Sequence, residues 1–398
     1  MTRKNVLLTL AVAALALQFS PAAAQQKPPI KVGAILPMTG PLGAAGLMFR
    51  TGIDIAVENI NSRGGVNGSL VELVVEDDKI NPAESVLMFR KHVGQGVVAV
   101  LGPISSSSWE NVSPLAPRLS LPAISFTFTY KEGVPNSPWT LGVSPDERTM
   151  LPEAVDEFVR LHPNVKNVVI AADVKQASGA AAIPIFRGAA TKHGIKVLDL
   201  IEFETQTLDF APIVTRIRSF SPDAIFSAGI PSSVIALLRE LGSQKFQVPV
   251  LNSGMIWPGA FPQAAGPGFE KVYTVGFSTN EPLKGNTKHN AYIEAFLAKL
   301  RGNPQMPQPP NPGNSVMGHE AMLMLAEIMA RKGIDGTTDP ARARLLVRDG
   351  LAEIKTFSNT FDIKIDDARN GYVRAHLLKV DVPSKQWMYG LPEEQRQQ

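Results

Sequence analysis

The feature that most constrains this fold is a regular alternation of short apolar segments with segments of helical periodicity. Ile30–Leu36 is an almost wholly apolar run ended by Pro37, and a helical pattern over 46–62 follows until Gly64 and Gly65. This strand–helix order repeats along most of the 398 residues. Strands that are apolar on both faces are typical of parallel sheets covered by helices on each side. We therefore expect an α/β fold with mostly parallel sheets.

The predicted elements form two similar series, so we expect two lobes. The strands are predicted at 30–36, 70–75, 97–101, 121–126, 139–143, 167–172, 196–203, 224–228, 248–251 and 272–277. Between and after them, helices are predicted at 46–62, from 82 onward, and at 152–161, 180–193, 210–220, 232–241, 287–300 and 315–332. A proline-rich surface loop at 303–312 separates the last two helices, and β-rich segments follow at 357–365 and 373–380. The polar tail at 393–398 is expected to fray.

The N-terminal segment has the layout of a secretory signal peptide. Arg3 and Lys4 precede an apolar run over 6–17, and small residues at 22–24 suit a cleavage site. An apolar run of about 12 residues is too short to span a bilayer. We expect cleavage near Ala24 and a mature chain that is exported to the periplasm.

Composition and motif searches exclude several functional classes. Lys+Arg exceeds Asp+Glu by only 39 − 36 = +3, and no basic cluster is visible, so nucleic acid is not an expected partner. The chain has no Cys, which excludes disulfides, thiolate metal sites and a cysteine nucleophile. The six His lack zinc-protease spacing, and neither a G-x-S-x-G motif nor a P-loop occurs. We expect no enzyme activity, no metal and no cofactor.

A serine run that follows one predicted strand is the most distinctive chemical feature. Its residues, 105–108, precede a predicted helix. Ligands of open α/β sheets bind outside the carboxyl ends of the strands, and hydroxyls with free backbone N–H groups suit an anion such as a carboxylate. One Ser would be enough for a simple helix cap, which is the alternative. After the next strand, 125–130 alternates hydroxyls with aromatic rings. Such a stretch can line a pocket, although its Phe residues could equally lie in the core.

Several motifs in a shared order resemble the branched-chain amino-acid (Leu/Ile/Val) binding proteins. These are the periplasmic substrate-binding components of bacterial ABC importers. The motifs are IKVG at 30–33, GGVNG at 64–68, VEDD at 75–78, LGP at 101–103 and DF at 209–210. The resemblance covers about residues 30–380.

The resemblance implies a type I periplasmic binding protein fold. Two Rossmann-like lobes would be joined by three hinge crossings near Ser144, Ser278 and Val373. The implied division is a signal peptide at 1–24, an N-terminal lobe of 25–144 plus 279–372, and a C-terminal lobe of 145–278 plus 373–398. The ligand would be captured by closure of the lobes, and an inner-membrane ABC permease would recognise the closed form. We expect a monomer.

The resemblance also implies candidate ligand-binding residues. In amino-acid-binding relatives, the serine loop and the next strand end hold the ligand's carboxylate and ammonium. The positions that match are Ser105, Ser106, Thr127 and Thr129, and we expect Ser106 and Thr129 to be the main carboxylate donors. Rings could come from Trp109, Phe128 and Trp257, although packing within the second lobe is the alternative for Trp257.

The second-lobe half of the site departs from the family pattern. Ala177 and Ile230 stand where the family has aromatic residues. The acid that holds the ligand's ammonium is expected at 252–255, a segment that includes Gly254, and none occurs there. A buried ammonium without its acid is unfavourable, so an α-amino acid would be a poor ligand unless Asp173 replaces that acid.

The ligand hypothesis is therefore a small carboxylate with an aromatic or other bulky apolar group. Two alternatives stay open. One is a branched-chain amino-acid or short-amide binding protein of the same family. The other is an exported ligand-sensing receptor domain.

Overall fold

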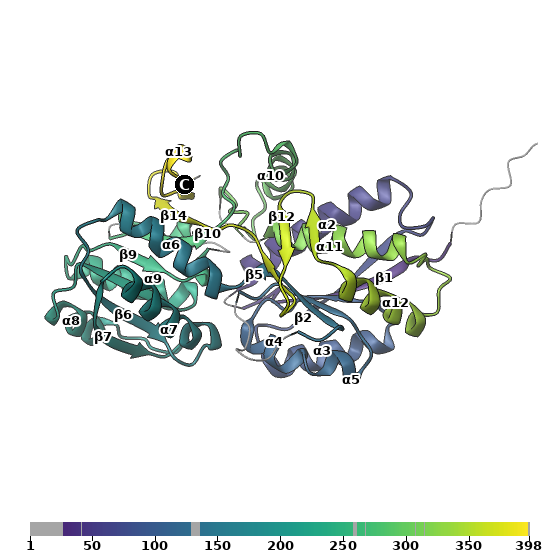
Figure 1. Cartoon of the computed structure of the whole chain (residues 1–398), viewed down its shortest axis with the longest axis horizontal. Helices are drawn as coiled ribbons and strands as arrows, with labels where there is room; N and C mark the ends of the chain where they lie inside the picture. The colour runs from purple at the N-terminus through teal and green to yellow at the C-terminus, as the bar shows by residue number, and fades with distance from the viewer. Residues whose placement is uncertain are drawn as a thin grey trace, which may run out of the picture.

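The chain forms two lobes, each built on one sheet (Figure 1). The computed structural model describes residues 27–40, 42–128, 136–257, 261–266, 268–306, 308–313 and 315–396. The predicted signal peptide at 1–24 lies outside these residues. In Figure 1, purple, blue and yellow-green segments share the first lobe, whereas teal segments dominate the second. The first lobe is therefore assembled from parts far apart in the sequence.

The first sheet is parallel except at one edge. In spatial order its strands are β11 (Thr356–Ser358), β12 (Asp362–Ile365), β13 (Asn370–Tyr372), β5 (Thr140–Pro145), β4 (Ala123–Ser125), β3 (Val100–Leu101), β1 (Ile30–Leu36) and β2 (Val71–Asp77). The pairs β11–β12 and β12–β13 are antiparallel, and the others are parallel. The strand predicted at 97–101 is shorter than expected, because only its last two residues pair with neighbours.

Helices cover both faces of this sheet, and its strand β1 is apolar on both faces. Val32 and Ala34 of β1 belong to the larger core cluster, together with Phe49 of α2 (Gly43–Ser62). Ile35, which points the other way, belongs to a smaller cluster with Phe89 of α3 (Pro82–Gly94). The remaining helices of this lobe are α4 (Ser106–Val112), α5 (Leu115–Arg118), α10 (Thr287–Leu300), α11 (Ser315–Arg331) and α12 (Pro340–Glu353).

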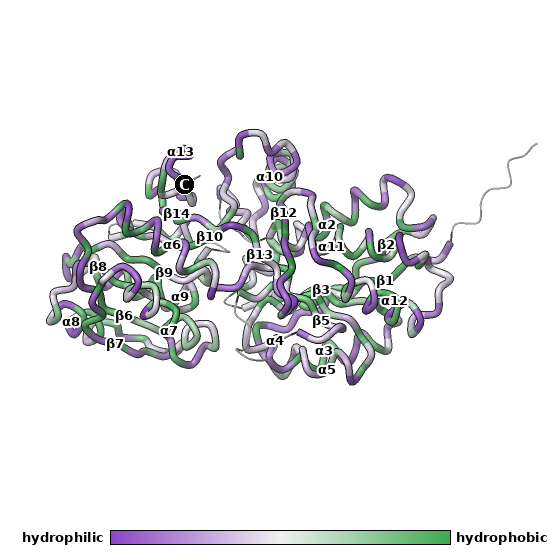
Figure 2. Tube along the Cα trace, viewed as in Figure 1, coloured by the Kyte–Doolittle hydropathy of each residue, from purple (hydrophilic) through white to green (hydrophobic). Residues whose placement is uncertain are grey.

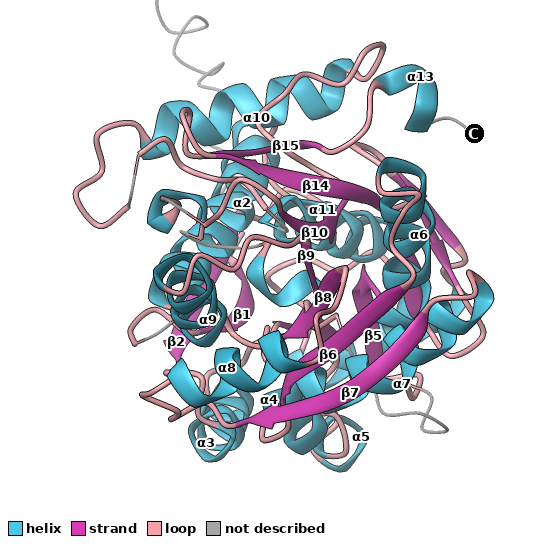
Figure 3. Ribbon diagram, turned by 90° about the vertical axis from the view of Figure 1, so that its left-hand side faces the viewer, coloured by secondary structure: helices cyan, strands magenta, loops and turns pink. Residues whose placement is uncertain are grey.

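The second sheet repeats the same plan. Its spatial order is β15 (Gln386–Tyr389), β14 (His376–Asp381), β10 (Val272–Gly276), β9 (Val250–Asn252), β8 (Ala224–Ala228), β6 (Asn167–Asp173) and β7 (Lys196–Phe203). Figure 3 looks onto this lobe and shows the twist from β7 to β15. The helices are α6 (Glu147–Leu161), α7 (Ala177–Lys192), α8 (Ala211–Ser219) and α9 (Pro231–Ser243). Phe226 of β8 packs on Phe158 of α6 and Phe186 of α7, with ring centroids 5.8 and 5.0 Å away.

Within the described residues, the chain passes between the two sheets three times. It leaves the first sheet after β5, returns after β10 through the segment that leads to α10, and leaves again between β13 and β14. The lobe boundaries given above at 144, 278 and 372 stay a prediction.

Two polar features of the sequence have the local roles that helix chemistry predicts. The Asn81 side chain accepts hydrogen bonds from Ala83 N at 2.9 Å and Glu84 N at 3.3 Å, which caps α3 as expected. In the tail, which was expected to fray, Glu393–Arg396 forms the short helix α13, and residues 397–398 lie outside the described residues. Arg160 donates to the Gln395 carbonyl at 3.0 Å and Arg374 to the Arg396 carbonyl at 2.7 Å, and these bonds hold the tail against the second lobe.

Hydrophobic residues concentrate in the strands at the middle of each lobe, and polar residues lie outside (Figure 2). None of the helices that the structure describes has the length and apolar character needed to cross a membrane.

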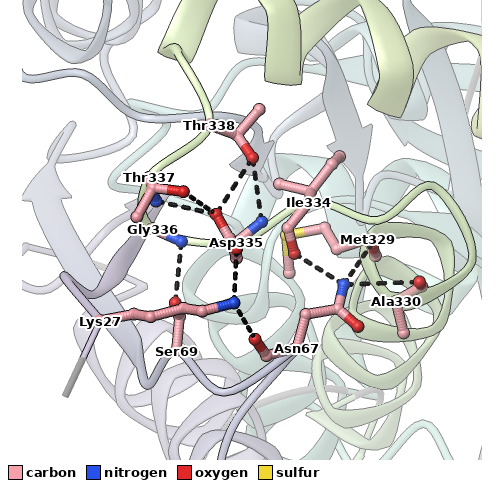
Figure 4. Close-up of polar contacts among 10 residues, drawn as sticks. All are labelled: Lys27, Asn67, Ser69, Met329, Ala330, Ile334, Asp335, Gly336, Thr337 and Thr338. Carbon is pink, nitrogen blue, oxygen red and sulfur yellow. Dashed lines mark hydrogen bonds and ion pairs between the residues drawn. The ribbon is translucent and has the colours of Figure 1, made fainter. Parts of the chain in front are cut away.

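The start of β1 is clamped to the α11–α12 connection (Figure 4). Lys27 Nζ donates to Asp335 Oδ2 at 2.6 Å and to the Asn67 carbonyl at 2.9 Å. Asn67 Nδ2 donates to the Ile334 carbonyl at 2.8 Å, just past the end of α11. The hydrogen bond from Lys27 and those from Thr337 lower the pKa of the Asp335 carboxyl well below its ordinary range. This clamp fixes the entry of the chain far from the lobe boundary.

Candidate functional site

Both sheets contain the strand order that places ligands at one edge. The orders are β2-β1-β3-β4-β5 and β7-β6-β8-β9-β10. In each, the second strand of the series lies on one side of the first strand, and all later strands lie on its other side. In doubly wound sheets of this kind, ligands bind outside the carboxyl ends of the strands at the point where the order reverses in this way. In the first lobe, the loops after β1, β3 and β4 lie at this edge. The serine run belongs to the loop after β3.

The serine run divides between structural and site-facing roles. Ser105 Oγ accepts from Ser108 N at 3.4 Å and caps α4. Ser108 Oγ bonds Ser85 Oγ at 2.8 Å, and Ser85 donates to Asp78 Oδ2 at 2.7 Å. Burial raises the pKa of the Asp78 carboxyl, although the hydrogen bond from Ser85 acts in the opposite direction. These residues hold the loop onto α3.

Ser106 and Thr127 form a buried hydroxyl pair. Their oxygens are 2.5 Å apart, although 21 residues separate them in sequence. Ser106 is 6% exposed and Thr127 is fully buried. Thr127 N also donates to Ser125 Oγ at 3.1 Å, which fixes the end of β4. The structure thus brings together two of the four predicted carboxylate donors. Of the other two, Ser105 caps α4 and Thr129 lies outside the described residues.

A narrow apolar pocket lies at the same edge and joins the two lobes. Phe126 and Phe49 stack on one side, with ring centroids 4.9 Å apart. Phe128 contributes to the wall, and Met255 reaches it from the second lobe. The complete lining is Leu42, Ala45, Phe49, Ile104, Phe126, Phe128 and Met255.

Other predicted residues lie around this pocket or away from it. Trp257 is fully buried, with its ring 6.1 Å from Phe128 across the lobe boundary and 4.5 Å from Phe277 within its own lobe. Ile230 is buried just before α9, and Ala177 begins α7, which lies against α4 of the first lobe.

Trp109 is not brought together with the other predicted residues. It lies in the smaller core cluster of the first lobe, among apolar residues such as Val112 and Leu121. The lining of the apolar pocket does not include it.

The structure reveals a buried acid that sequence reasoning missed. Glu147 is fully buried at the start of α6, and its Oε1 accepts from Gly254 N at 2.8 Å. Its backbone N donates to the Phe128 carbonyl at 2.7 Å. The carboxylate therefore contacts one predicted site residue, Gly254, which precedes the pocket residue Met255 in the chain, and the backbone of Glu147 contacts another, Phe128. The only signal in the sequence was an acidic pair, Asp146-Glu147, after the fifth predicted strand.

Asp173, the residue that could have replaced the missing acid, is already held within its own lobe. Thr205 Oγ1 donates to Asp173 Oδ2 at 2.6 Å, and Lys175 N donates to Oδ1 at 3.1 Å. It is fully buried at the carboxyl end of β6.

Four buried polar atoms near the carboxyl ends of β8 and β9 have no partner among the described residues. They are Ser227 Oγ, Ser233 Oγ, Asn252 Oδ1 and Ser253 Oγ. The second lobe therefore holds buried hydrogen-bonding groups near these strand ends that the sequence analysis did not identify. Across the described parts of the chain, no group of three or more His, Asp or Glu side chains could hold a metal ion.

Comparisons with known proteins give one family and several relatives. The model of the periplasmic binding protein family matches residues 29–372. The Leu/Ile/Val-binding protein BraC3 of Rhizobium johnstonii is 31% identical over 245 residues, which are 61% of this chain and 64% of that protein. That match thus spans less than two thirds of the relative. The leucine-, isoleucine-, valine-, threonine- and alanine-binding protein of Pseudomonas aeruginosa is 25% identical over 348 residues, 85% of this chain and 87% of that protein.

Solved structures with the same fold bind two kinds of ligand. The branched-chain amino-acid transporter substrate-binding protein LivJ of Streptococcus pneumoniae, in complex with isoleucine, matches at a TM-score of 0.76 and 21% identity. The match covers 89% of this chain and 97% of LivJ. A solute-binding protein of an ABC transporter from R. palustris, in complex with benzoate, matches at 0.75 and 18%, covering 91% and 95%. These likenesses show the fold, two α/β lobes of the type I kind, as the sequence predicted.

Proposed function

The chain belongs to the periplasmic binding protein family, and we propose that it captures a small carboxylate bearing an aromatic or bulky apolar group. The family resemblance predicted from the sequence is confirmed, and so is the expectation of a substrate-binding protein without enzyme activity. In our proposal the protein is exported, loses residues 1–24, and acts as a monomer in the periplasm. It closes on its ligand and presents the closed form to an inner-membrane ABC permease.

The observation that carries this proposal is the buried hydroxyl pair at the same sheet edge as the apolar pocket. The two hydroxyls are paired at 2.5 Å, and in our proposal Ser106 donates to the ligand's carboxylate. A hydrogen bond to a charged group contributes about 1.5–3 kcal/mol. The pocket is lined by Phe49, Phe126 and Phe128, and an aromatic contact adds about 0.5–1.5 kcal/mol beyond burial. This arrangement favours a ligand with a charged end and an apolar ring.

Hinge closure is the proposed mechanism, because the pocket lining comes from both lobes. Met255 belongs to the second lobe, whereas the other lining residues belong to the first. A ligand that touches both sides stabilises the closed form and shifts the equilibrium toward it.

A branched-chain amino acid is the second candidate, and Glu147 favours it. Its buried carboxylate accepts from Gly254 N, and its backbone N donates to the Phe128 carbonyl. In this second candidate function, the ligand's ammonium group donates to that carboxylate. The argument against amino acids rested on the lack of an acid at 252–255, and Glu147 weakens that argument.

A thermal-shift screen separates the two candidates. The purified full-length mature protein would be heated with benzoate, cinnamate and aliphatic oxo-acids in one set, and with leucine, isoleucine and valine in another. We expect aryl carboxylates to raise the Tm in a concentration-dependent way. Matched benzamide and cinnamamide serve as controls, because they keep the ring but lose the charge. Stabilisation by leucine or valine, with none by aryl carboxylates, would refute the favoured ligand.

A further inference from the structure

The proline-rich loop between α10 and α11 makes unexpected contacts with the second lobe. We call its residues 308–313 the strap. Both flanking helices belong to the first lobe, where each packs against α2. The sequence predicted an ordinary surface loop. It has no regular structure, but Asn311 within it is only 4% exposed.

Two hydrogen bonds tie the strap to the second lobe, and a third ties it to the segment of the second crossing. Gln263 Nε2, between β9 and β10, donates to the Pro309 carbonyl at 2.6 Å. Asn280 Nδ2, just past the end of β10, donates to the Pro310 carbonyl at 3.0 Å. Asn311 Nδ2 donates to the Trp257 carbonyl at 2.7 Å. Donors thus come from both the strap and the second lobe, and two of the acceptors are fixed by proline.

On the second-lobe side, Trp257 is held by further contacts. The Trp257 carbonyl also accepts from Trp387 Nε1 at 3.1 Å, and Trp387 stacks on Phe261 with ring centroids 5.5 Å apart. The Trp257 indole N–H donates to the Ser278 carbonyl at 3.0 Å, beside the second crossing. A movement of the strap would therefore displace Trp257 and the second-lobe residues bonded to it.

The strap also reaches the candidate ligand pocket through Trp257. The Trp257 ring lies 6.1 Å from that of Phe128, which lines the pocket. Asn311 contacts the backbone of Trp257 and not the pocket itself. It can thus act on the ligand only by fixing the place of Trp257.

We propose that the strap is a fourth, non-covalent link between the lobes and that Asn311 is a positioning residue for Trp257. Three chain crossings alone leave the hinge free to rotate. The strap adds a restraint beside the second crossing, so it limits how far the lobes open without ligand. A narrower open ensemble raises the fraction of molecules competent to bind, and apparent affinity rises with that fraction. This inference rests on the hinge closure of the proposed function.

The test measures the distance between the lobes in the ligand-free protein. Because the chain has no Cys, Arg118→Cys on α5 and Leu208→Cys before α8 give two unique spin-label sites. Both positions are exposed, Leu208 to 97%. Double electron–electron resonance between the two spin labels then reports the distribution of interlobe distances.

Gln263→Ala and, separately, Asn311→Ala each remove one hydrogen bond between the strap and the second lobe. The matched control is Gln308→Ala, because Gln308 Nε2 also donates to two carbonyls, those of Leu300 and Met306, but both belong to the first lobe. Circular dichroism checks that each variant folds. Gln263 is only half-buried, so Gln263→Ala keeps the test decisive if Asn311→Ala does not fold.

We expect both strap variants to broaden the ligand-free distribution and shift it to longer distances, with the control unchanged. Loss of one hydrogen bond also predicts a two- to tenfold weaker affinity. A distribution equal to that of the parent in both folded strap variants would overturn the proposal. Because this comparison needs no ligand, its outcome is separate from the ligand hypothesis. A failure of hinge closure itself would show as an unchanged distance when a stabilising ligand is added to the parent protein.

Discussion

Replacement of Ser106 by Ala tests the proposed anion site at its best-defined contact. The change removes the hydroxyl 2.5 Å from Thr127 Oγ1 and nothing else of the side chain. In the free protein, loss of this pair is expected to cost about 1 kcal/mol of the free energy of unfolding. In the complex, one hydrogen bond to a carboxylate is lost, which contributes about 1.5–3 kcal/mol. The Kd of a carboxylate ligand should therefore rise roughly 10- to 100-fold.

The matched control for this variant is Ser107→Ala. Ser107 is the next residue of the same run and is half-buried. Asn111 Nδ2 donates to its backbone carbonyl, which the substitution keeps, and its hydroxyl makes no hydrogen bond to the residues that the structure describes. Isothermal titration calorimetry with the best ligand of the thermal-shift screen gives both Kd values. We expect the control to stay within about twofold of the parent. Equal Kd values for the two variants would refute the role of Ser106, and urea unfolding would show whether Ser106→Ala still folds.

Three further predictions follow from other contacts. Glu147→Gln should leave the affinity for aryl carboxylates within a few-fold of the parent and abolish any stabilisation by amino acids, because the negative charge is lost. Thermal shift with both ligand sets checks this, and a large loss of affinity for aryl carboxylates would contradict it. Gly179→Ala should reduce the free energy of unfolding by about 1–3 kcal/mol in urea titrations, because its Cβ would lie 2.1 Å from the Asp173 carbonyl oxygen. The control is Gly188→Ala on the same helix, whose Cβ would meet no atom within 4 Å and which should be neutral or stabilising. Burial lowers the pKa of the His289 ring below the ordinary value of about 6.5. As the pH falls from 7 to 5, the unfolded state therefore binds more protons than the folded state, and the free energy of unfolding decreases. His289→Gln should make this decrease smaller in melting experiments at different pH values.

The strands could be predicted from the sequence where apolar character alone decides them. The predicted bounds of β7 and β8 agree with the structure to the residue, because each is a short apolar or alternating run between polar breaks. The helix α12 was missed because its charged residues hide a narrow apolar stripe. Its buried face, Ala343, Val347 and Leu351, repeats every four residues, and Asp339-Pro340 marks its start as Asn81-Pro82 marks that of α3.

The candidate site could be predicted only in part, because its contacts depend on which strands are neighbours. The serine run pointed to the correct edge, since the rule for parallel sheets needs only the strand order. The pairing of Ser106 with Thr127 required β3 and β4 to lie side by side. Glu147 was missed because its partner, Gly254, lies 107 residues further along the chain, and no local pattern connects the two.

Native mass spectrometry tests the central claim most directly. The protein would be purified without refolding and incubated with an equimolar mixture of benzoate, cinnamate, leucine and valine. Our account predicts one bound molecule per chain with the mass of an aryl carboxylate, and a marked loss of that species in Ser106→Ala. A complex that carries leucine or valine instead, or a chain that retains none of the four, would contradict it.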